Sequence, residues 1–212
     1  MKKLFILLIL LIVFINLFGK NMFDDKKKLA DSAEEICPIK VGEQVPEVFV
    51  KSPDGDHVNL KEYISGSNAV LIFYRGGWCP FCNLQLSGLN KIDIELVEIG
   101  YKLVAISIDK PEKLKESMSM HNLNYTLLSD SKADASIAFG LAFKVEDEYN
   151  KMLKSYDMDI EDASGENHHI LPVPAVYLVD SNGVIQFDYV NPNYKVRLDE
   201  QLLLKAARHI AN

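Results

Sequence analysis

Cysteine is scarce in this sequence, which has only three in 212 residues: Cys37, Cys79 and Cys82. A small domain held together by several disulfides needs more cysteines, so that class of protein is excluded. Three cysteines still allow one reactive pair and one further thiol. Basic residues are also too few for a nucleic-acid-binding surface, because 23 lysines and arginines stand against 30 acidic residues and the net charge is −7. We expect no nucleic-acid partner.

One long hydrophobic run is present, and it lies at the N-terminus. Met1-Lys2-Lys3 precedes residues 4–18, which are apolar except for one asparagine and have no charge. This is the form of a secretory signal, or of a short membrane anchor. We therefore predict a signal peptide or N-terminal membrane anchor at residues 1–19 and a polar spacer at 20–38. The domain at 39–212 is then exported, periplasmic or otherwise extracytoplasmic, with cleavage or tethering to the inner membrane by residues 4–18 both open.

Strand-like segments divide the domain into a regular order. Short β-prone pieces at 45–50 and 57–60 flank a turn-forming cluster and predict an N-terminal β-hairpin. Continuous apolar runs at 69–74 and 102–108 have the length of strands buried on both faces. A second hairpin is expected at 176–189, around the turn Asp-Ser-Asn-Gly.

Helix-like segments alternate with these strands. Leucines and isoleucines recur at helical spacing over residues 82–99, a proline opens a helix at 111–121, and an amphipathic helix is expected at 198–210. Residues 141–171 are polar and acidic, and we interpret them as an insertion before the final hairpin. The order predicts a single α/β domain with a central mixed β-sheet flanked by helices, paired in parallel early and antiparallel late.

The junction between the first buried strand and its helix holds the residues with most chemical promise. It reads Phe-Tyr-Arg-Gly-Gly-Trp-Cys-Pro-Phe-Cys over residues 73–82, with two cysteines three positions apart. A helix N-terminus has unpaired N–H groups and a partial positive charge, which favour a thiolate over a thiol. Pro80 suits the first helical position, so Cys79 is expected at the N-cap and more exposed than Cys82. The pattern favours a redox-active dithiol.

Two other interpretations of the cysteine pair stay open at this point. Cys-x-x-Cys can form half of a zinc site, although the sequence contains no second such pair. The two cysteines could also be buried and inert, although proline and glycine at a strand-to-helix turn do not serve packing. His168-His169 lies in the acidic insertion and is interpreted as a plain loop.

The Cys-Pro-Phe-Cys set at the end of a strand resembles the dithiol of glutaredoxins and thioredoxins. Residues 171–175, Leu-Pro-Val-Pro-Ala, stand ahead of a hairpin and resemble the cis-proline segment of the same fold. The resemblance implies a thioredoxin-like fold, with a cis peptide bond between Val173 and Pro174.

A closer resemblance covers nearly the whole domain from about Ile39. The segments 41–48, 73–83 and 172–180 are similar to those of the alkyl hydroperoxide reductase/thiol-specific antioxidant (AhpC/TSA) family, whose members include peroxiredoxins. The usual loop of that family, Pro-x-x-x-Thr-x-x-Cys, places its cysteine on Cys82, its threonine on Cys79 and its proline on Arg75. Only the cysteine is kept. The family's downstream arginine has no counterpart either, because residues 171–175 hold prolines instead.

The family resemblance implies a thiol peroxidase that reduces hydrogen peroxide and organic hydroperoxides without a cofactor or metal. A thioredoxin-like donor would recycle a disulfide between Cys79 and Cys82. The alignment nominates Cys82 as the attacking residue, whereas dithiol chemistry nominates Cys79. Arg75 is the candidate cation, with a packing role as the alternative.

Further predictions concern the residues around the dithiol. Trp78, Pro80 and Pro174 are expected to position the substrate. Cys37 is either a bystander or a second resolving thiol. The missing threonine and arginine favour the alternative function, an exported thiol-disulfide oxidoreductase acting on protein cysteines. The sequence does not predict the oligomeric state.

Overall fold

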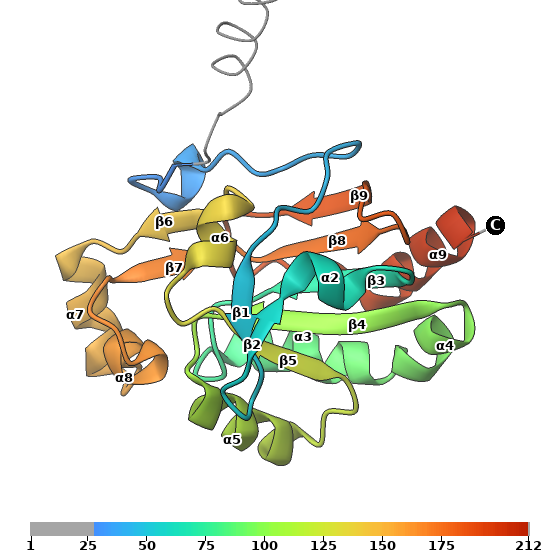
Figure 1. Cartoon of the computed structure of the whole chain (residues 1–212). Coiled ribbons are helices and arrows are strands. Elements are labelled where there is room, and N and C mark those ends of the chain that lie inside the picture. The colour runs from blue at the N-terminus through green and yellow to red at the C-terminus, as the bar shows by residue number, and fades with distance from the viewer. Residues whose placement is uncertain (1–27, 212) are drawn as a thin grey trace, which may run out of the picture.

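The computed structural model describes residues 28–211, so the expected signal or anchor at 1–19 lies outside the described residues (Figure 1). The strands are β1 (Phe49–Lys51), β2 (His57–Asn59), β3 (Asn68–Phe73), β4 (Tyr101–Ser107), β5 (Thr126–Ser129), β6 (Ala142–Lys144), β7 (Ile170–Pro172), β8 (Ala175–Val179) and β9 (Ile185–Val190). The helices are η1 (Ala33–Glu35), α2 (Leu60–Ile64), α3 (Pro80–Asn90), α4 (Asp93–Glu98), α5 (Pro111–His121), α6 (Asp134–Ala138), α7 (Asp147–Ser155), α8 (Ile160–Ser164) and α9 (Glu200–Ala211).

Seven strands form one mixed sheet in the order β2-β1-β5-β4-β3-β8-β9 (Figure 1). Strand β4 pairs in parallel with β3 and β5, whereas β8 pairs antiparallel with β3 and β9. The two predicted hairpins are β1–β2 and β8–β9. The expected α/β class, with early parallel and late antiparallel pairing, is confirmed.

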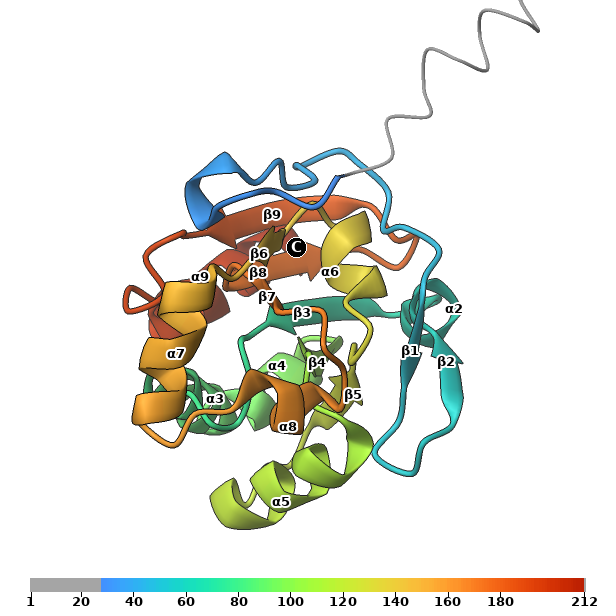
Figure 2. The same cartoon turned by 90° about the vertical axis from the view of Figure 1, so that its left-hand side faces the viewer.

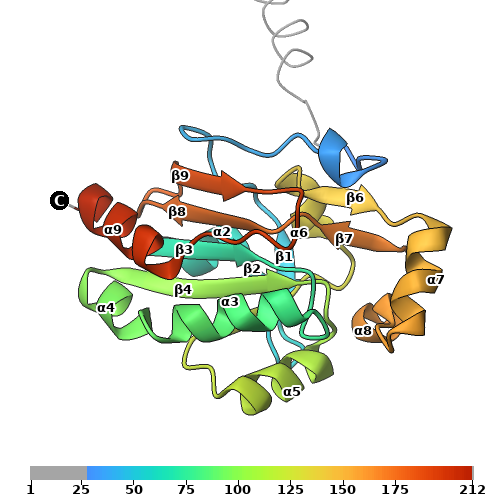
Figure 3. The same ribbon diagram turned by 180° about the vertical axis from the view of Figure 1, so that it is seen from behind.

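Strand β3 is central because its side chains are buried on both faces of the sheet. Ala69, Leu71 and Phe73 pack with residues of α2 and α6, and Val70 and Ile72 pack with residues of α3, α4 and α9. Figures 1 and 3 show these two groups of helices on opposite sides of the sheet. Burying each large apolar side chain contributes about 1.5–3 kcal/mol, so a continuous apolar run is the sequence that this position requires.

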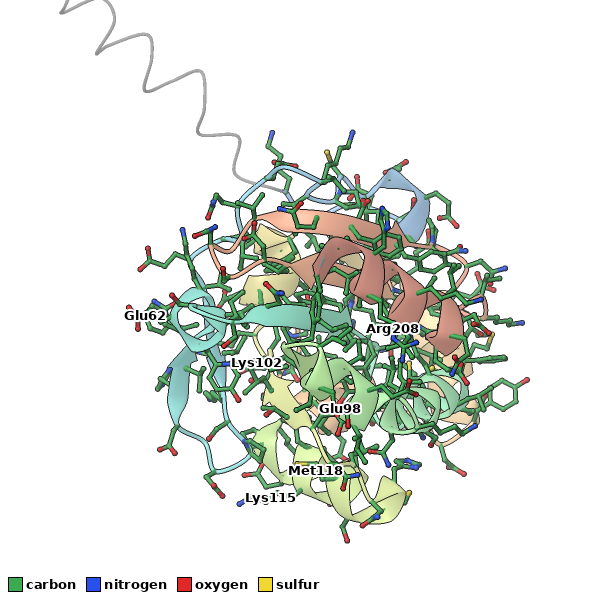
Figure 4. The ribbon with its side chains drawn as sticks, turned by 90° about the vertical axis from the view of Figure 1, so that its right-hand side faces the viewer. Glu62, Glu98, Lys102, Lys115, Met118 and Arg208 are labelled. Carbon is green, nitrogen blue, oxygen red and sulfur yellow. The ribbon has the colours of Figure 1, made fainter. Side chains whose placement is uncertain are left out.

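The long helix expected at 82–99 is two helices. Helix α3 ends at Asn90, the N–H of Lys91 turns back to the carbonyl oxygens of Gly88 and Leu89, and α4 restarts after the fully buried Ile92. The periodicity did not reveal this break, because both helices bury apolar residues on the same face of the sheet. Figure 4, which labels Glu98 and Arg208, shows α4 and α9 side by side on that face.

The expected insertion at 141–171 is ordered and has its own small core. Strands β6 and β7 form a separate two-stranded sheet, and apolar residues of α7 and α8 pack with it. These elements lie together at one end of the main sheet (Figures 1 and 2). The described part of the expected spacer joins them, because Ala30 donates its N–H to the carbonyl oxygen of Ala142 at 3.0 Å. Residues 28–38 are therefore packed against the domain.

The parallel strands end near this same group of elements. The arrow of β4 points toward the side where β6, β7, α7 and α8 lie (Figure 3), and β3 runs parallel to it. In open α/β sheets, binding sites form beyond the carboxyl ends of the strands, where the chain connections diverge. The dithiol motif follows β3 and therefore lies in this region.

Candidate active site

The turn from β3 into α3 depends on two glycines. Gly76 has a φ of +148°, and a Cβ added there would lie 2.3 Å from Trp78 Nε1 and 2.7 Å from Asp109 Oδ1. A Cβ on Gly77 would lie 2.1 Å from Ser117 Oγ. Only glycine fits such a backbone conformation and such close neighbours without strain. The turn that precedes the cysteines is therefore tightly packed.

Cys79 occupies the N-cap position of α3 and Pro80 the first helical position, as predicted. The thiols of Cys79 and Cys82 are not bridged in this structure, and both residues are buried, with 1% and 0% of their surfaces exposed. Cys79 was expected to be the more exposed of the two, but the difference is negligible because both residues are buried. The helix N-terminus still contributes, because a hydrogen bond with the Cys82 backbone lowers the pKa of Cys79, and the side chains around the pair contribute as well.

The pKa values of the two thiols are shifted in opposite directions. A hydrogen bond from the Cys82 thiol lowers the pKa of Cys79 to about 6 against the opposing effect of burial, and a hydrogen bond with the Cys82 backbone and the charges of Arg75 and Arg197 lower it further. Burial raises the pKa of Cys82 well above its ordinary value, and the neighbouring Cys79 raises it further. At neutral pH the pair therefore consists of a Cys79 thiolate and a Cys82 thiol, which is the arrangement of a nucleophile beside a proton donor.

Arg197 supplies a cation that the sequence did not reveal. Its Nη2 donates to Cys82 Sγ at 3.2 Å, while its Nε and Nη1 are buried without a hydrogen-bond partner. The residue lies between β9 and α9, so only the folded chain brings it to the dithiol. The family's usual downstream arginine is missing from residues 171–175, and Arg197 brings a guanidinium from another segment. The signal available in the sequence was weak: Arg197 is one of only three arginines.

Arg75 is buried in a box of aromatic rings. Its guanidinium lies 4.2 Å from the ring centre of Tyr194, 5.0 Å from that of Trp78 and 5.6 Å from that of Tyr149. Its Nη2 also donates to the Tyr149 hydroxyl at 2.9 Å. The residue is thus both packed and electrostatically active, because its charge helps to lower the pKa of Cys79.

A cavity of about 380 Å³ opens beside this aromatic box. Its lining is mostly apolar and comes from the spacer segment, the 141–171 region and the loop after β9, including Arg75, Tyr149, Val173, Pro174 and Tyr194. Pro174 and Arg75 therefore line the same cavity. Pro80 is exposed at the helix start and lines neither this cavity nor the one described below.

The peptide bond between Val173 and Pro174 is trans, so the expected cis-proline is wrong. The backbone around it differs from the expected segment: β7 pairs with β6, and the N–H of Val173 donates to the Leu141 carbonyl oxygen at 2.9 Å. The extended chain then enters β8 directly. The 141–171 region holds the proline segment in this path.

Asp109 is a second site residue that sequence analysis did not identify. It is 1% exposed, and its Oδ2 accepts hydrogen bonds from the Gly77 N–H at 2.7 Å and the Ser107 hydroxyl at 3.1 Å. Burial raises the pKa of Asp109 to about 7. The carboxyl group and Trp78 line another cavity of about 260 Å³.

The remaining candidates lie elsewhere or have other contacts. His168 contacts the Ser131 carbonyl oxygen at 2.8 Å, and His169 pairs with Glu161. Cys37 is exposed on the segment after η1. Within residues 28–211, no cluster of three or more His, Cys, Asp or Glu side chains has the arrangement of a metal site.

Comparison with known proteins now decides between the families that share such a fold. The model of the AhpC/TSA family matches residues 41–188, which include the whole dithiol loop. The chain belongs to the AhpC/TSA family. Membership of this family makes it an oxidoreductase of the peroxidase class. Peroxiredoxin Bcp of Escherichia coli strain K12 is 34% identical over 138 residues, covering 63% of this chain and 85% of that protein.

Solved structures of other proteins have the same fold as this AhpC/TSA-family chain. Peroxidoxin BcpB from Mycobacterium tuberculosis matches with a TM-score of 0.64 at 18% identity, over 81% of this chain and 98% of that one. Reduced Prx3 from Vibrio vulnificus, solved in complex with hydrogen peroxide, matches with a TM-score of 0.66 at 18% identity, over 80% and 99%. The thioredoxin-like fold expected from the dithiol is therefore confirmed.

These comparisons correct the expectation of export. The relatives that establish the AhpC/TSA family are Bcp-type peroxiredoxins, and they give no support to a periplasmic or inner-membrane protein. Among the described residues, no helix combines the length and apolarity needed to cross a membrane. The expectation rested on the apolar run at 4–18, which lies outside the described residues.

Proposed function

We propose that this protein is a thiol peroxidase that reduces hydrogen peroxide and organic hydroperoxides, with Cys79 as the attacking thiolate and Cys82 as the resolving thiol. The observation that supports this assignment most is the lowered pKa of Cys79, about 6, beside a Cys82 thiol whose pKa is raised. A thiolate near neutral pH is what attack on a peroxide requires. Cys79 replaces the threonine of the family's usual loop, so this order of attack differs from the one that the alignment nominates.

The proposed reaction has two steps at the thiol pair. The Cys79 sulfur attacks the terminal oxygen of the hydroperoxide, an S–O bond forms, the O–O bond breaks, and the alkoxide leaves and takes a proton. The Cys82 sulfur then attacks the Cys79 sulfenic acid, an S–S bond forms, and hydroxide leaves with the proton of Cys82 as water. Arg75 and Arg197 stabilise the negative charge that moves onto the leaving oxygen.

Substrate and donor follow from the chemistry and the relatives. The mostly apolar 380 Å³ cavity beside Arg75 fits the organic part of a hydroperoxide, with Pro174 and Tyr194 as walls. A related structure of Xanthomonas campestris bacterioferritin comigratory protein was solved to explain alkyl peroxide reduction in that protein. The resulting disulfide between Cys79 and Cys82 needs a dithiol to reduce it, and a thioredoxin-like protein is the proposed donor.

A second candidate function is reduction of disulfides in other proteins. The observation that favours it is that the first cysteine of Cys-x-x-Cys, rather than the second, has the lowered pKa, as in a dithiol reductant. The burial of Cys79, 1% exposed, opposes it because a protein disulfide must reach the attacking sulfur. A peroxide is small enough to reach the buried sulfur of Cys79, whereas a loop of another protein is too large.

Steady-state assays distinguish the two functions. Reduced protein with thioredoxin, thioredoxin reductase and NADPH is expected to consume hydrogen peroxide and an aromatic hydroperoxide, and to reduce insulin slowly or not at all. Cys79→Ser is expected to abolish peroxide consumption, because it removes the sulfur that is proposed to attack. Cys37→Ser is the matched control and is expected to keep the activity of the unmodified chain.

Two results would contradict the proposal. Insulin reduction without peroxide consumption would assign the protein to disulfide reduction. Full peroxide attack by Cys79→Ser, together with none by Cys82→Ser, would exchange the roles of the two cysteines.

A further inference from the structure

Asp109 has an unusual place among the buried polar groups of the described chain. Its Oδ2 accepts two hydrogen bonds, from Gly77 and Ser107, whereas its Oδ1 is buried with no hydrogen-bond partner. An unpaired oxygen on a buried carboxyl group costs free energy unless it has a proton or a partner during function.

The unpaired oxygen of Asp109 lies close to the dithiol loop at Gly76. A Cβ on Gly76 would meet both Asp109 Oδ1 and Trp78 Nε1, so these two unpaired atoms crowd the same side of the glycine. The 260 Å³ cavity lined by Gly77, Trp78, Asp109, Lys113 and Ser117 lies against the carboxyl group. The cavity has room for water, which can move protons between the loop and the carboxyl group.

Charged and titratable groups surround Asp109 on several sides. Burial is the main effect that opposes its ionisation, and the Cys79 thiolate at the start of α3 adds a smaller one. The Gly77 N–H and the Ser107 hydroxyl favour ionisation, as does Lys113 of α5. Lys113 also forms ion pairs with Asp162 at 3.0 Å and with Glu116 at 3.7 Å, and these weaken its attraction for the Asp109 carboxylate. Tyr74, packed against the same region, stays neutral because burial raises its pKa.

The thiolate and the carboxylate therefore oppose each other. While Cys79 is a thiolate, Asp109 is favoured in its protonated form. When the sulfur attacks a peroxide, its negative charge passes to the leaving oxygen and Cys79 becomes a neutral sulfenic acid. One of the effects that favour the protonated form is then lost, so Asp109 releases its proton more readily at the moment when an alkoxide needs one.

We propose that Asp109 is the proton store of the thiol pair, which gives its proton to the leaving alkoxide and regains one when the disulfide is reduced. This inference rests on the proposed peroxidase function. In the first step the alkoxide takes the Asp109 proton and leaves as an alcohol, or as water when the substrate is hydrogen peroxide. The disulfide then forms with loss of water. A donor dithiol finally passes two electrons and two protons, which restore the Cys79 thiolate, the Cys82 thiol and protonated Asp109.

Asp109→Asn tests the proposal because it removes the proton while keeping an oxygen for the Gly77 N–H. The rate of the first turnover is measured against pH with reduced protein and excess hydrogen peroxide. The unmodified chain is expected to gain rate as Cys79 ionises near pH 6 and to lose rate above about pH 7 as Asp109 ionises. Asp109→Asn is expected to lose the falling limb and to react about 100-fold more slowly at pH 6.5.

Asp130→Asn is the matched control. Asp130 is also buried, at 2% exposure, and burial raises its pKa to about 7, but its carboxyl group accepts from Ala135 and Ser136 rather than from the dithiol loop. It is expected to keep the pH profile of the unmodified chain. Ser107→Ala provides a second test, since losing a hydroxyl that favours the carboxylate should move the falling limb to higher pH.

Trp78, the only tryptophan, reports the titration without any reaction. In a Cys79→Ser/Cys82→Ser background its fluorescence is expected to titrate in the neutral range, and Asp109→Asn should abolish that change. A pH profile of Asp109→Asn identical to that of the unmodified chain would overturn the inference while leaving the peroxidase assignment intact. Absence of peroxide consumption in the unmodified chain would instead refute the proposed function, and the inference that rests on it.

Discussion

At the scale of single residues, Arg197 brings a guanidinium to a dithiol that lacks the family's usual arginine. Its guanidinium reaches Cys82 Sγ across 115 positions of sequence and contributes to the lowered pKa of Cys79. A planar cation with several donors can contact the sulfur and a developing negative charge on oxygen at once. Two of its nitrogens are buried without a hydrogen-bond partner.

Arg197→Met is expected to slow peroxide reduction about 10- to 100-fold, in the range seen when one stabilising donor is removed. Losing the cation also raises the pKa of Cys79, so the rising limb of the pH profile should move to higher pH. Stopped-flow measurement of the first turnover tests both effects. Arg208→Met, which changes an arginine that pairs with Glu95 on the surface, is the control. Equal rates and profiles for Arg197→Met and the control would remove Arg197 from the mechanism.

At the scale of secondary-structure elements, the turn from β3 into α3 is the most constrained part of the fold. It must pass Trp78, Asp109 and Ser117 at distances that leave no room for a side chain on either glycine. Such turns place reactive groups where regular elements cannot, at a cost to stability. The rigid strand and helix on either side hold the cysteines in register.

Gly76→Ala should therefore destabilise the protein more than an alanine at another glycine with positive φ. Gly55, with a φ of +90° and no atom within 4 Å of an added Cβ, is the matched control. Both variants incur backbone strain, but only Gly76→Ala adds collisions, so we expect an extra loss of about 1–3 kcal/mol in the free energy of unfolding. Urea denaturation measures the difference. Equal losses of unfolding free energy in the two variants would show that the loop rearranges to accommodate the added methyl group.

The same elements show what sequence could and could not predict. Strand β3 and helix α5 were predictable because their signals, an apolar run and a proline start, are local. The dithiol was predictable for the same reason. The break between α3 and α4 and the trans bond before Pro174 depend on packing against distant segments. Arg197 and Asp109 join the site only through the topology of the sheet, so no local pattern marks them.

At the scale of the whole molecule, one end of the sheet assembles the site from distant segments. The ends of β3 and β4 bring the dithiol loop and Asp109 together, and the segment after β9 adds Tyr194 and Arg197. The 141–171 region and the segment before β1 complete the cavity beside Arg75. The thioredoxin-like sheet is thus a scaffold, and the chemistry belongs to the loops at its carboxyl edge.

In the proposed function, Cys79 reduces a hydroperoxide and Cys82 resolves the resulting sulfenic acid. Fully reduced protein treated with one equivalent of hydrogen peroxide, then measured by intact-mass and peptide mass spectrometry, tests it most directly. The unmodified chain is predicted to lose the mass of a hydrogen molecule through a disulfide between Cys79 and Cys82, and Cys82→Ser to gain one oxygen atom on Cys79. Unreacted thiols, or oxidation confined to Cys82 and Cys37, would contradict the account.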